Sequence, residues 1–203
     1  MAFIFQARTS CNERFHDKYH ATYGVIHRAD LLNVILDACK KSNLIKLAAS
    51  KKVVAIEDDG SIVTARTESG ETYRGAAMVG CDGLWSTVRE KVVGDGKPNA
   101  SGHIAYRAVL PISEWPKDYR IPKMVVWCGE KTHLVHYPLR RGEWFNLVAV
   151  FHSDRYEEGR DSYGDPEELH IRFAEKCQPV RTLLRKVNAW KMWVLCDRPP
   201  IKN

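Results

Sequence analysis

The chain has 203 residues, of which 44% are hydrophobic and 28% charged, as is typical of a globular protein. It contains no run of about 18 apolar residues, and its first residues lack a long apolar region and a cleavage site, so a membrane span and a signal peptide are excluded. Its lysines and arginines give a net charge of +6 but are scattered, which favours a solvated surface over nucleic-acid binding. We therefore expect a cytoplasmic protein.

The cysteines are far apart and form no C-x-x-C pair, so neither a zinc site nor a redox motif is supported. In a cytosolic chain, cysteines of this kind are reduced and behave as small, half-buried apolar residues. The six positions are Cys11, Cys39, Cys81, Cys128, Cys177 and Cys196.

The first half of the chain alternates helical and strand-like patterns. Apolar residues at helical spacing predict a helix over 29–41, and Asp58-Asp59-Gly60 predicts a turn between two strands. The strands are expected over 44–49, 52–57, 61–67 and 76–79, and the last of these runs into a glycine turn and a helix over 84–93. A strand, a glycine turn and a helix form an α/β crossover element, and strands of this kind are expected to be parallel.

The second half has a different texture. Residues 96–102 are predicted to be a linker, and β-branched or aromatic residues then alternate with polar ones, as in a half-exposed antiparallel sheet. The expected strands are 103–112, 122–128, 131–139, 143–152 and 191–196, and the expected helices are 165–175 and 179–189. The chain is therefore predicted to have two parts, residues 1–97 and residues 98–203.

The segment GCDGLWSTVRE, from Gly80 to Glu90, carries the most specific pattern. Gly80 and Gly83 allow a tight turn at a strand end, and the following helix offers free N–H groups to a ligand. A bare Asp-Gly is usually a surface turn in which the aspartate caps a helix. The longer pattern G-x-D-G-x-x-S-x-V-R, which runs to Arg89, is much rarer by chance.

This pattern resembles the second flavin fingerprint of the FAD-dependent aromatic-ring hydroxylases, the class A flavoprotein monooxygenases that include para-hydroxybenzoate hydroxylase. The segment from His27 to Leu31 resembles the H-R-x-x-L that opens a helix in this family, where the arginine approaches the flavin. Val53 falls where the family's backbone contacts the adenine ring. The resemblance implies cofactor contacts for Arg28, Val53, Asp82, Gly83 and Arg89.

The later segments look most like the bacterial 3-hydroxybenzoate 6-hydroxylases, in the stretches 105–107, 132–139, 146–151 and 197–201. The resemblance implies that the sheet over 103–152 roofs an aromatic substrate, with Tyr23, His133 and Tyr137 as pocket residues. In this family a flavin C4a-hydroperoxide attacks the ring, and a phenolate reacts faster than a phenol. His133 is therefore the candidate base, with Tyr137 on the same strand face, whereas His136 is expected to point away.

The implied fold is α/β, α+β overall: residues 1–97 form part of a Rossmann-like FAD-binding domain, and residues 98–203 form an antiparallel-sheet substrate domain with capping helices. The implied cofactors are FAD and, as co-substrate, NADH or NADPH. The implied partners are a small aromatic acid and molecular oxygen, with neither nucleic acid nor membrane, and a homodimer is allowed for a full-length parent.

The chain departs from the family pattern at both ends. It has no G-x-G-x-x-G, and it stops before the family's third flavin motif, so we expect a fragment that binds FAD weakly or not at all and is inactive alone. The opening residues suggest an alternative start, a frameshift or a truncated gene model. The expected parent reaction is 3-hydroxybenzoate to gentisate. The alternatives are a salicylate 1-hydroxylase and a non-catalytic module that binds aromatic acids.

Overall fold

The computed structural model describes residues 13–21, 23–153 and 162–201. The chain divides into two compact units. Unit 1 comprises residues 1–34 and 102–195, and unit 2 comprises residues 35–101 and 196–203. The predicted boundary at residue 97 assigns a cofactor part and a substrate part, and that functional assignment stays a prediction.

Unit 1 is built on a six-stranded sheet with the order β5-β6-β7-β4-β9-β8. The strands are β4 (Asn99–Pro111), β5 (Val125–Gly129), β6 (Thr132–Leu139), β7 (Trp144–His152), β8 (Ser162–Gly164) and β9 (Trp190–Asp197). The long pairings β5–β6, β6–β7 and β4–β7 are antiparallel, which confirms the predicted type of sheet. The predicted linker at 96–102 is wrong in its second half, because β4 already begins at Asn99.

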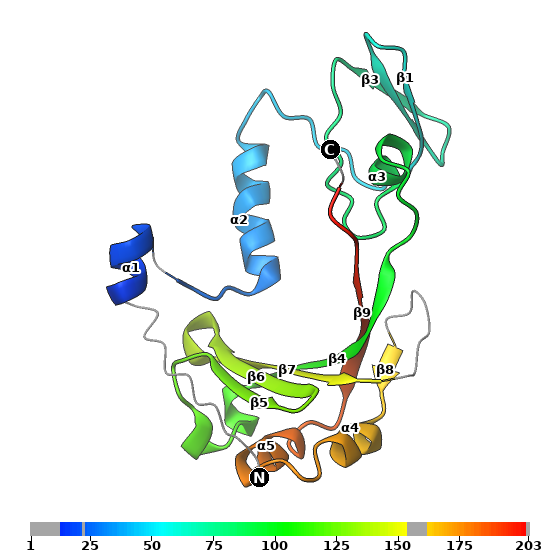
Figure 1. The fold of residues 1–203 in the computed structure, drawn as a ribbon. Helices are drawn as coiled ribbons and strands as arrows, with labels where there is room; N and C mark the ends of the chain where they lie inside the picture. The colour runs from blue at the N-terminus through cyan, green and yellow to red at the C-terminus, as the bar shows by residue number, and fades with distance from the viewer. Residues whose placement is uncertain (1–12, 22, 154–161, 202–203) are drawn as a thin grey trace. The chain divides into compact units, whose positions relative to one another are not determined.

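Two short helices, α4 (Pro166–Arg172) and α5 (Gln178–Leu184), cover one face of this sheet (Figure 1). The carboxylate of Asp165 accepts a hydrogen bond from Glu167 N, and proline occupies the first helical position, as the sequence predicts. Both helices are shorter than expected. The buried core between the helices and the sheet includes Tyr106, Leu134, Leu147, Phe151, Leu169, Phe173, Leu183 and Trp190.

Short 3-10 turns occur in two of the described strand connections of unit 1: η1 (Ile112–Glu114) and η2 (Lys117–Tyr119) lie between β4 and β5, and η3 (Arg140–Gly142) lies between β6 and β7. In η3, which joins β6 to β7, Arg140 and Arg141 have positive φ angles of 46° and 57°. Side chains other than glycine rarely adopt this left-handed conformation, so the turn is strained.

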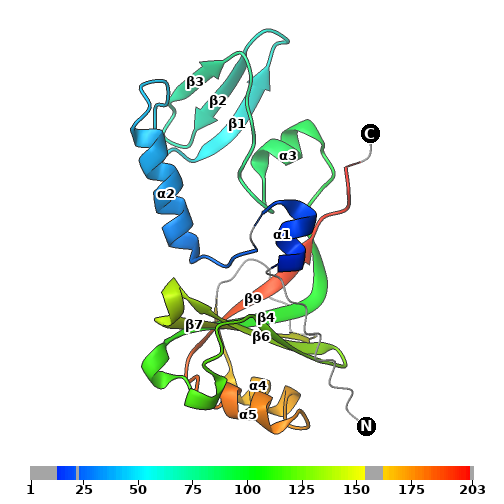
Figure 2. The same cartoon turned by 90° about the vertical axis from the view of Figure 1, so that its left-hand side faces the viewer.

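The helices α1 (Glu13–Tyr19) and α2 (Arg28–Lys40) precede the sheets (Figure 2). The predicted helix over 29–41 is confirmed. Its apolar stripe is not buried, however, since no residue of α2 is buried, and Leu32 and Ile35 are both more than half exposed.

Unit 2 contains a three-stranded antiparallel sheet of β1 (Val53–Asp58), β2 (Val63–Thr67) and β3 (Thr72–Gly75), followed by α3 (Thr87–Val92). The turn at residues 58–60 is confirmed. Parallel strands were the wrong expectation, and residues 44–49 and 76–79 are not strands. A strand forms only where its backbone has a hydrogen-bonding partner. β2 pairs with β1 and β3, its neighbours in the sequence, and not with residues 44–49 or 76–79.

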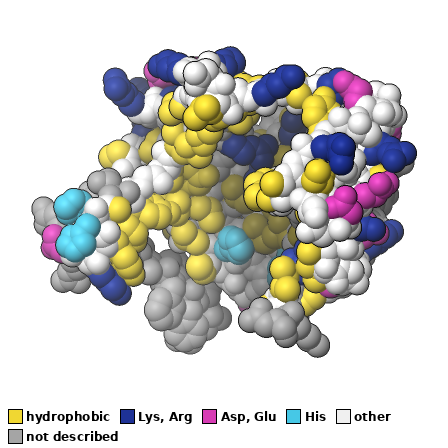
Figure 3. Space-filling model, turned by 90° about the horizontal axis from the view of Figure 1, so that it is seen from above, with side chains coloured by type: hydrophobic (Ala, Val, Ile, Leu, Met, Phe, Trp, Pro, Cys, Tyr) yellow, Lys and Arg dark blue, Asp and Glu magenta, His cyan; other side chains and the backbone are white. Residues whose placement is uncertain are grey.

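Unit 2 has little apolar core. Among its described residues, Ile56 and Pro98 are the apolar side chains that are buried, while Leu44 and Val79 are 91% and 83% exposed. Hydrophobic side chains are correspondingly visible at the surface in Figure 3. Half-burial of the cysteines holds for Cys39, Cys177 and Cys196, but Cys81 and Cys128 are exposed, and Cys11 lies outside the described residues. None of the described helices has the length and apolarity to cross a membrane.

Candidate functional site

The sheet face opposite α4 and α5 carries the candidate substrate residues. Side chains alternate along β6, so Leu134 and His136 are buried toward the helices while His133 and Tyr137 lie on the open face. This confirms that His133 and Tyr137 share a face and that His136 points away. Val135 lies between them, and the backbones of His133 and Tyr137 are about 13 Å apart along the strand.

The register of β6 and β7 completes this face. Val135 pairs with Val148, and Tyr137 pairs with Asn146. The two valines form an apolar floor between the polar ends marked by His133 and Tyr137.

His133 lines a cavity of about 520 Å³ near the β5–β6 hairpin. Cys128 is its register partner on β5, and Lys131 and His103 also line the cavity. Partial burial lowers the pKa of the His133 imidazole, and positive charge on His103 lowers this pKa further. His133 is therefore neutral at pH 7, which is the form of histidine that can accept a proton.

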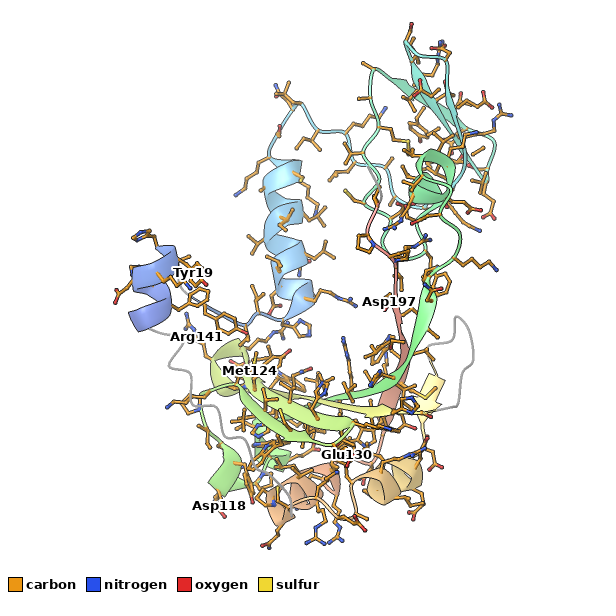
Figure 4. All side chains as sticks on the ribbon, viewed as in Figure 1. Tyr19, Asp118, Met124, Glu130, Arg141 and Asp197 are labelled. Carbon is orange, nitrogen blue, oxygen red and sulfur yellow. The ribbon has the colours of Figure 1, made fainter. Side chains whose placement is uncertain are left out.

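Tyr23 and Tyr137 belong to the other end of the open face. The hydroxyl of Tyr23 donates to the sulfur of Met124 at 3.8 Å, and Met124 immediately precedes β5. Met124 and Arg141, both labelled in Figure 4, lie at the same end of the sheet. Neither Tyr23 nor Tyr137 lines the cavity at His133, so the structure brings the three residues to one face but not into one pocket.

Sequence reasoning missed Asn146. Its side-chain nitrogen is buried and has no hydrogen-bond partner among the described residues. A buried amide donor without an acceptor is unfavourable, so this atom is suited to an acceptor on a ligand. The sequence showed that Asn146 is a polar residue within the alternating pattern of the predicted strand 143–152. Its position beside Tyr137 follows only from the strand register.

The glycine-rich segment of unit 2 forms the start of α3. The carboxylate of Asp82 accepts hydrogen bonds from Ser86 Oγ at 2.5 Å and from Thr87 N at 2.7 Å. These contacts, with the Ser86 bond the strongest cause, lower the pKa of Asp82. Gly83 has a φ of 78°, which favours glycine. At Gly80, a Cβ atom would lie 2.5 Å from Val88 Cβ, so glycine allows α3 to approach the chain closely.

Arg89 is held within the chain. Its Nε donates to Asp95 Oδ2 at 2.9 Å, and its guanidinium also donates to the carbonyl oxygen of Pro199 at 2.8 Å. Arg198 adds a second guanidinium, with Nη1 3.0 Å from Asp95 Oδ1. The guanidinium predicted to contact the cofactor is thus engaged in a local ion-pair network.

The other two predicted cofactor residues lie at element starts. Arg28 is the exposed first residue of α2, and its guanidinium forms no hydrogen bond or ion pair with any described side chain or backbone group. Val53 is the first residue of β1, beside an irregularity in the β1–β2 register. Arg28 belongs to unit 1, whereas Val53, Asp82 and Gly83 belong to unit 2. Taken separately, the available guanidinium in unit 1 and the left-handed glycine turn in unit 2 are each suited to a phosphate-bearing cofactor.

Comparison with known proteins identifies the family. The model of the FAD binding domain matches residues 2–198, and the chain belongs to this FAD-binding-domain family of flavin-dependent proteins. It is 40% identical over 190 residues to 3-hydroxybenzoate 6-hydroxylase 1 of Aquipseudomonas alcaligenes, covering 94% of this chain and 48% of the relative. It is 30% identical over 193 residues to the 3-amino-4-hydroxybenzoate 2-monooxygenase PtnB3 of Streptomyces platensis, covering 95% and 48%.

The fold agrees with these relatives. A salicylate hydroxylase in complex with substrate superimposes with a TM-score of 0.68 at 22% identity, over 84% of this chain and 46% of that one. The mixed fold of helices and antiparallel sheet is therefore that of the FAD-dependent aromatic hydroxylases, as the sequence predicts. The chain spans about half the length of the curated relatives it matches.

Proposed function

We propose that this chain supplies the substrate-binding sheet and part of the FAD site of an NAD(P)H-dependent aromatic-ring monooxygenase, and that the ring is a hydroxybenzoate. The observation that carries the proposal is the open face of β6 and β7, where an apolar floor separates a neutral histidine from a tyrosine and an unpaired amide. The relatives named 3-hydroxybenzoate 6-hydroxylase support 3-hydroxybenzoate as the substrate and gentisate as the product.

The face matches the chemistry of a hydroxybenzoate. Such an acid has a flat apolar ring, for which Val135 and Val148 provide a surface. His133 accepts the phenolic proton through its imidazole, which makes the ring more electron-rich. Asn146 and Tyr137 offer donors to the carboxylate at the other end of the floor, because a carboxylate accepts hydrogen bonds only.

The cofactor part of the proposal rests on Arg28, Val53, Asp82 and Gly83. When bound, FAD would supply the activated oxygen for ring hydroxylation. Arg28 would contribute a guanidinium to it, and Gly83 would let the backbone approach it closely. Arg89 would support the cofactor site indirectly, because its contacts with Asp95 fix the segment that follows α3.

Ligand binding tests the proposal. The purified chain is loaded with FAD and titrated calorimetrically with 3-hydroxybenzoate, salicylate and benzoate. We expect 3-hydroxybenzoate to bind at least about tenfold more tightly than benzoate, because the phenol adds a hydrogen bond to His133. His133→Gln should remove most of this preference.

His170→Gln is the matched control, since His170 lies in α4 on the helical side of the sheet. It should leave the preference unchanged. Equal affinity for all three acids would contradict a phenol-recognising site, and a clear preference for salicylate would instead support the salicylate hydroxylase alternative.

A further inference from the structure

The start of α2 is tied to the turn between β6 and β7 by a long-range ion pair. Arg140 Nε donates to Asp30 Oδ2 at 2.8 Å, and Arg140 Nη2 donates to Asp30 Oδ1 at 2.6 Å. The two residues are 110 positions apart in the sequence. Both belong to unit 1. This two-pronged arrangement fixes the relative orientation of the two groups, which a single contact would not do.

The contact shifts the pKa values of both partners. The hydrogen bond from Arg140 is the main cause that lowers the pKa of Asp30, and the same bond raises the pKa of Arg140. His27 is also near this carboxylate, with Nδ1 4.0 Å from Asp30 Oδ1, the oxygen that accepts from Arg140 Nη2. Asp30 thus has two basic side chains near it, one from the residue just before α2 and one from the β6–β7 turn.

The backbone that presents Arg140 is strained. Arg140 and Arg141 both have left-handed φ angles, and Gly142 follows with a φ of 92°. A conformation that is unfavourable for two successive arginines persists only where the surroundings hold it, and such places often serve a function. The bond to Asp30 is a contact that this unusual turn makes possible.

Each end of the ion pair lies next to a residue of the candidate site. Asp30 is two residues after Arg28, in the first turn of α2. Arg140 directly follows β6 and is three residues after Tyr137. The pair therefore connects the segment proposed to contact FAD with the strand proposed to contact the aromatic acid.

We propose that the Asp30–Arg140 pair is a positioning device, which holds the start of α2 on the β6–β7 turn so that Arg28 is oriented for the cofactor. The inference rests on the proposed function for the role of Arg28, while the contact itself is read directly from the structure. Arg140 does not touch the reacting groups in this proposal. It acts through Asp30, and neighbouring Arg28 contacts the cofactor.

Two measurements on the full chain test this proposal. Hydrogen–deuterium exchange of residues 28–34 reports whether the helix start is held, and quenching of FAD fluorescence reports the cofactor affinity. For Arg140→Gln we expect faster exchange and weaker FAD binding, each on the order of tenfold, the scale of a lost charged hydrogen bond. Arg140→Lys keeps the charge but loses the planar guanidinium, so its exchange rate and FAD affinity should lie between those of the wild type and of Arg140→Gln.

A double-mutant cycle and a matched control make the test specific. Asp30→Asn combined with Arg140→Gln should be no worse than either change alone, because both remove the same contact. Asp37→Asn breaks the Asp37–Lys40 pair of 3.8 Å on the same helix and should change neither readout.

The outcomes separate the two proposals. If Arg140→Gln accelerates exchange but leaves the FAD affinity at the wild-type value, the pair is only a structural contact and the positioning role is overturned. If exchange at 28–34 does not respond to Arg140→Gln, the role is overturned at its first step. A wild-type chain that takes up no FAD would sink the cofactor role of Arg28 and the positioning role with it, whatever the exchange data show.

Discussion

Each of the two compact units is stabilised internally by different interactions. Unit 1 has a continuous apolar core of strand, turn and helix residues, in which Phe145 stacks on Trp115 with ring centres 4.9 Å apart. Unit 2 buries two apolar side chains among its described residues, Ile56 and Pro98, and relies on backbone pairing and ion pairs. Burial of apolar surface is the dominant favourable term in folding, so unit 1 should be much the more stable of the two.

This difference also separates the two halves of the proposed function. The substrate face stands on the strand layer of unit 1, whose other side is covered by helices. Of the proposed cofactor residues, Val53, Asp82 and Gly83 lie in the unit with little core. Recognition of the aromatic acid should therefore be more robust in this chain than retention of FAD.

The largest expected effect compares the same substitution in the two units. Leu183→Ala in α5 removes a fully buried side chain and should lower the free energy of unfolding by about 2–5 kcal/mol. Leu44→Ala removes a side chain that is 91% exposed and should change it by less than about 0.5 kcal/mol. Urea unfolding followed by tryptophan fluorescence measures both. Similar losses would show that Leu44 is covered in solution and would remove the contrast.

The next effect is a loss of stability in mild acid that originates in unit 1. His136 is fully buried beside Trp115, without hydrogen-bond partners among the described residues, and burial lowers its pKa from 6.5 to about 4. The unfolded chain takes up this proton first, so the stabilisation is complete above pH 6.5 and is lost as the pH falls toward 4. The loss should amount to about 3 kcal/mol.

His136→Leu is the variant that isolates this effect, because an apolar side chain of similar size needs no proton and no partner. Its stability should fall much less than that of the wild type over the same pH range, and the remaining slope is expected from His133, whose pKa is also lowered from 6.5. The lowered pKa values of Asp82 and Asp95 act below their unfolded value of 3.8, outside this window. An unchanged slope in His136→Leu would assign the acid sensitivity to another group.

A smaller, local effect is expected in unit 2. Arg198 donates to Asp95 Oδ1 at 3.0 Å, to the carbonyl oxygen of Gly96 at 2.7 Å and to that of Leu84 at 2.8 Å, and so joins the end of the described chain to the segment around α3. Arg198→Ala should raise hydrogen exchange over residues 84–96 by about tenfold, the scale of one charged hydrogen bond.

Exchange in β6 and β7 should not respond to this change, since those strands belong to the other unit. Arg185→Ala is the control, because Arg185 is exposed and its guanidinium has no partner among the described residues. A response across the whole chain to Arg198→Ala would show that the two units unfold together.

The sequence predicted unit 1 better than unit 2, for a physical reason. In β6 and β7, burial on one side produces a clear alternation of residue types, and the shared face of His133 and Tyr137 followed from that pattern alone. The apolar run at 76–79 has the composition of a buried strand, but composition does not show whether a backbone partner is present. The short strand β3 is polar and entirely exposed, so no pattern marked it.

In the candidate site, residues that belong to a local sequence motif were predictable, whereas contacts between distant segments were not. Arg28 and Asp82 were found through motifs, and for Asp82 the neighbours in the sequence are also its hydrogen-bond partners. The contact of Asp30 with Arg140 spans 110 residues, and the place of Asn146 beside Tyr137 depends on strand register. Neither has a local signature, so both required the structure.

The smallest effect tests whether exposed ion pairs hold unit 2 together. Lys52 Nζ lies 2.8 Å from Glu68 Oε1, but both side chains are mostly exposed, so water and salt screen their attraction. Lys52→Ala should move the thermal midpoint by less than about 1 °C. Thermal scans of the wild type and the variant in low and high salt measure this directly. A clear loss that disappears at high salt would mean that such pairs carry the stability which unit 2 does not obtain from an apolar core, and the contrast between the units would then be one of mechanism rather than of strength.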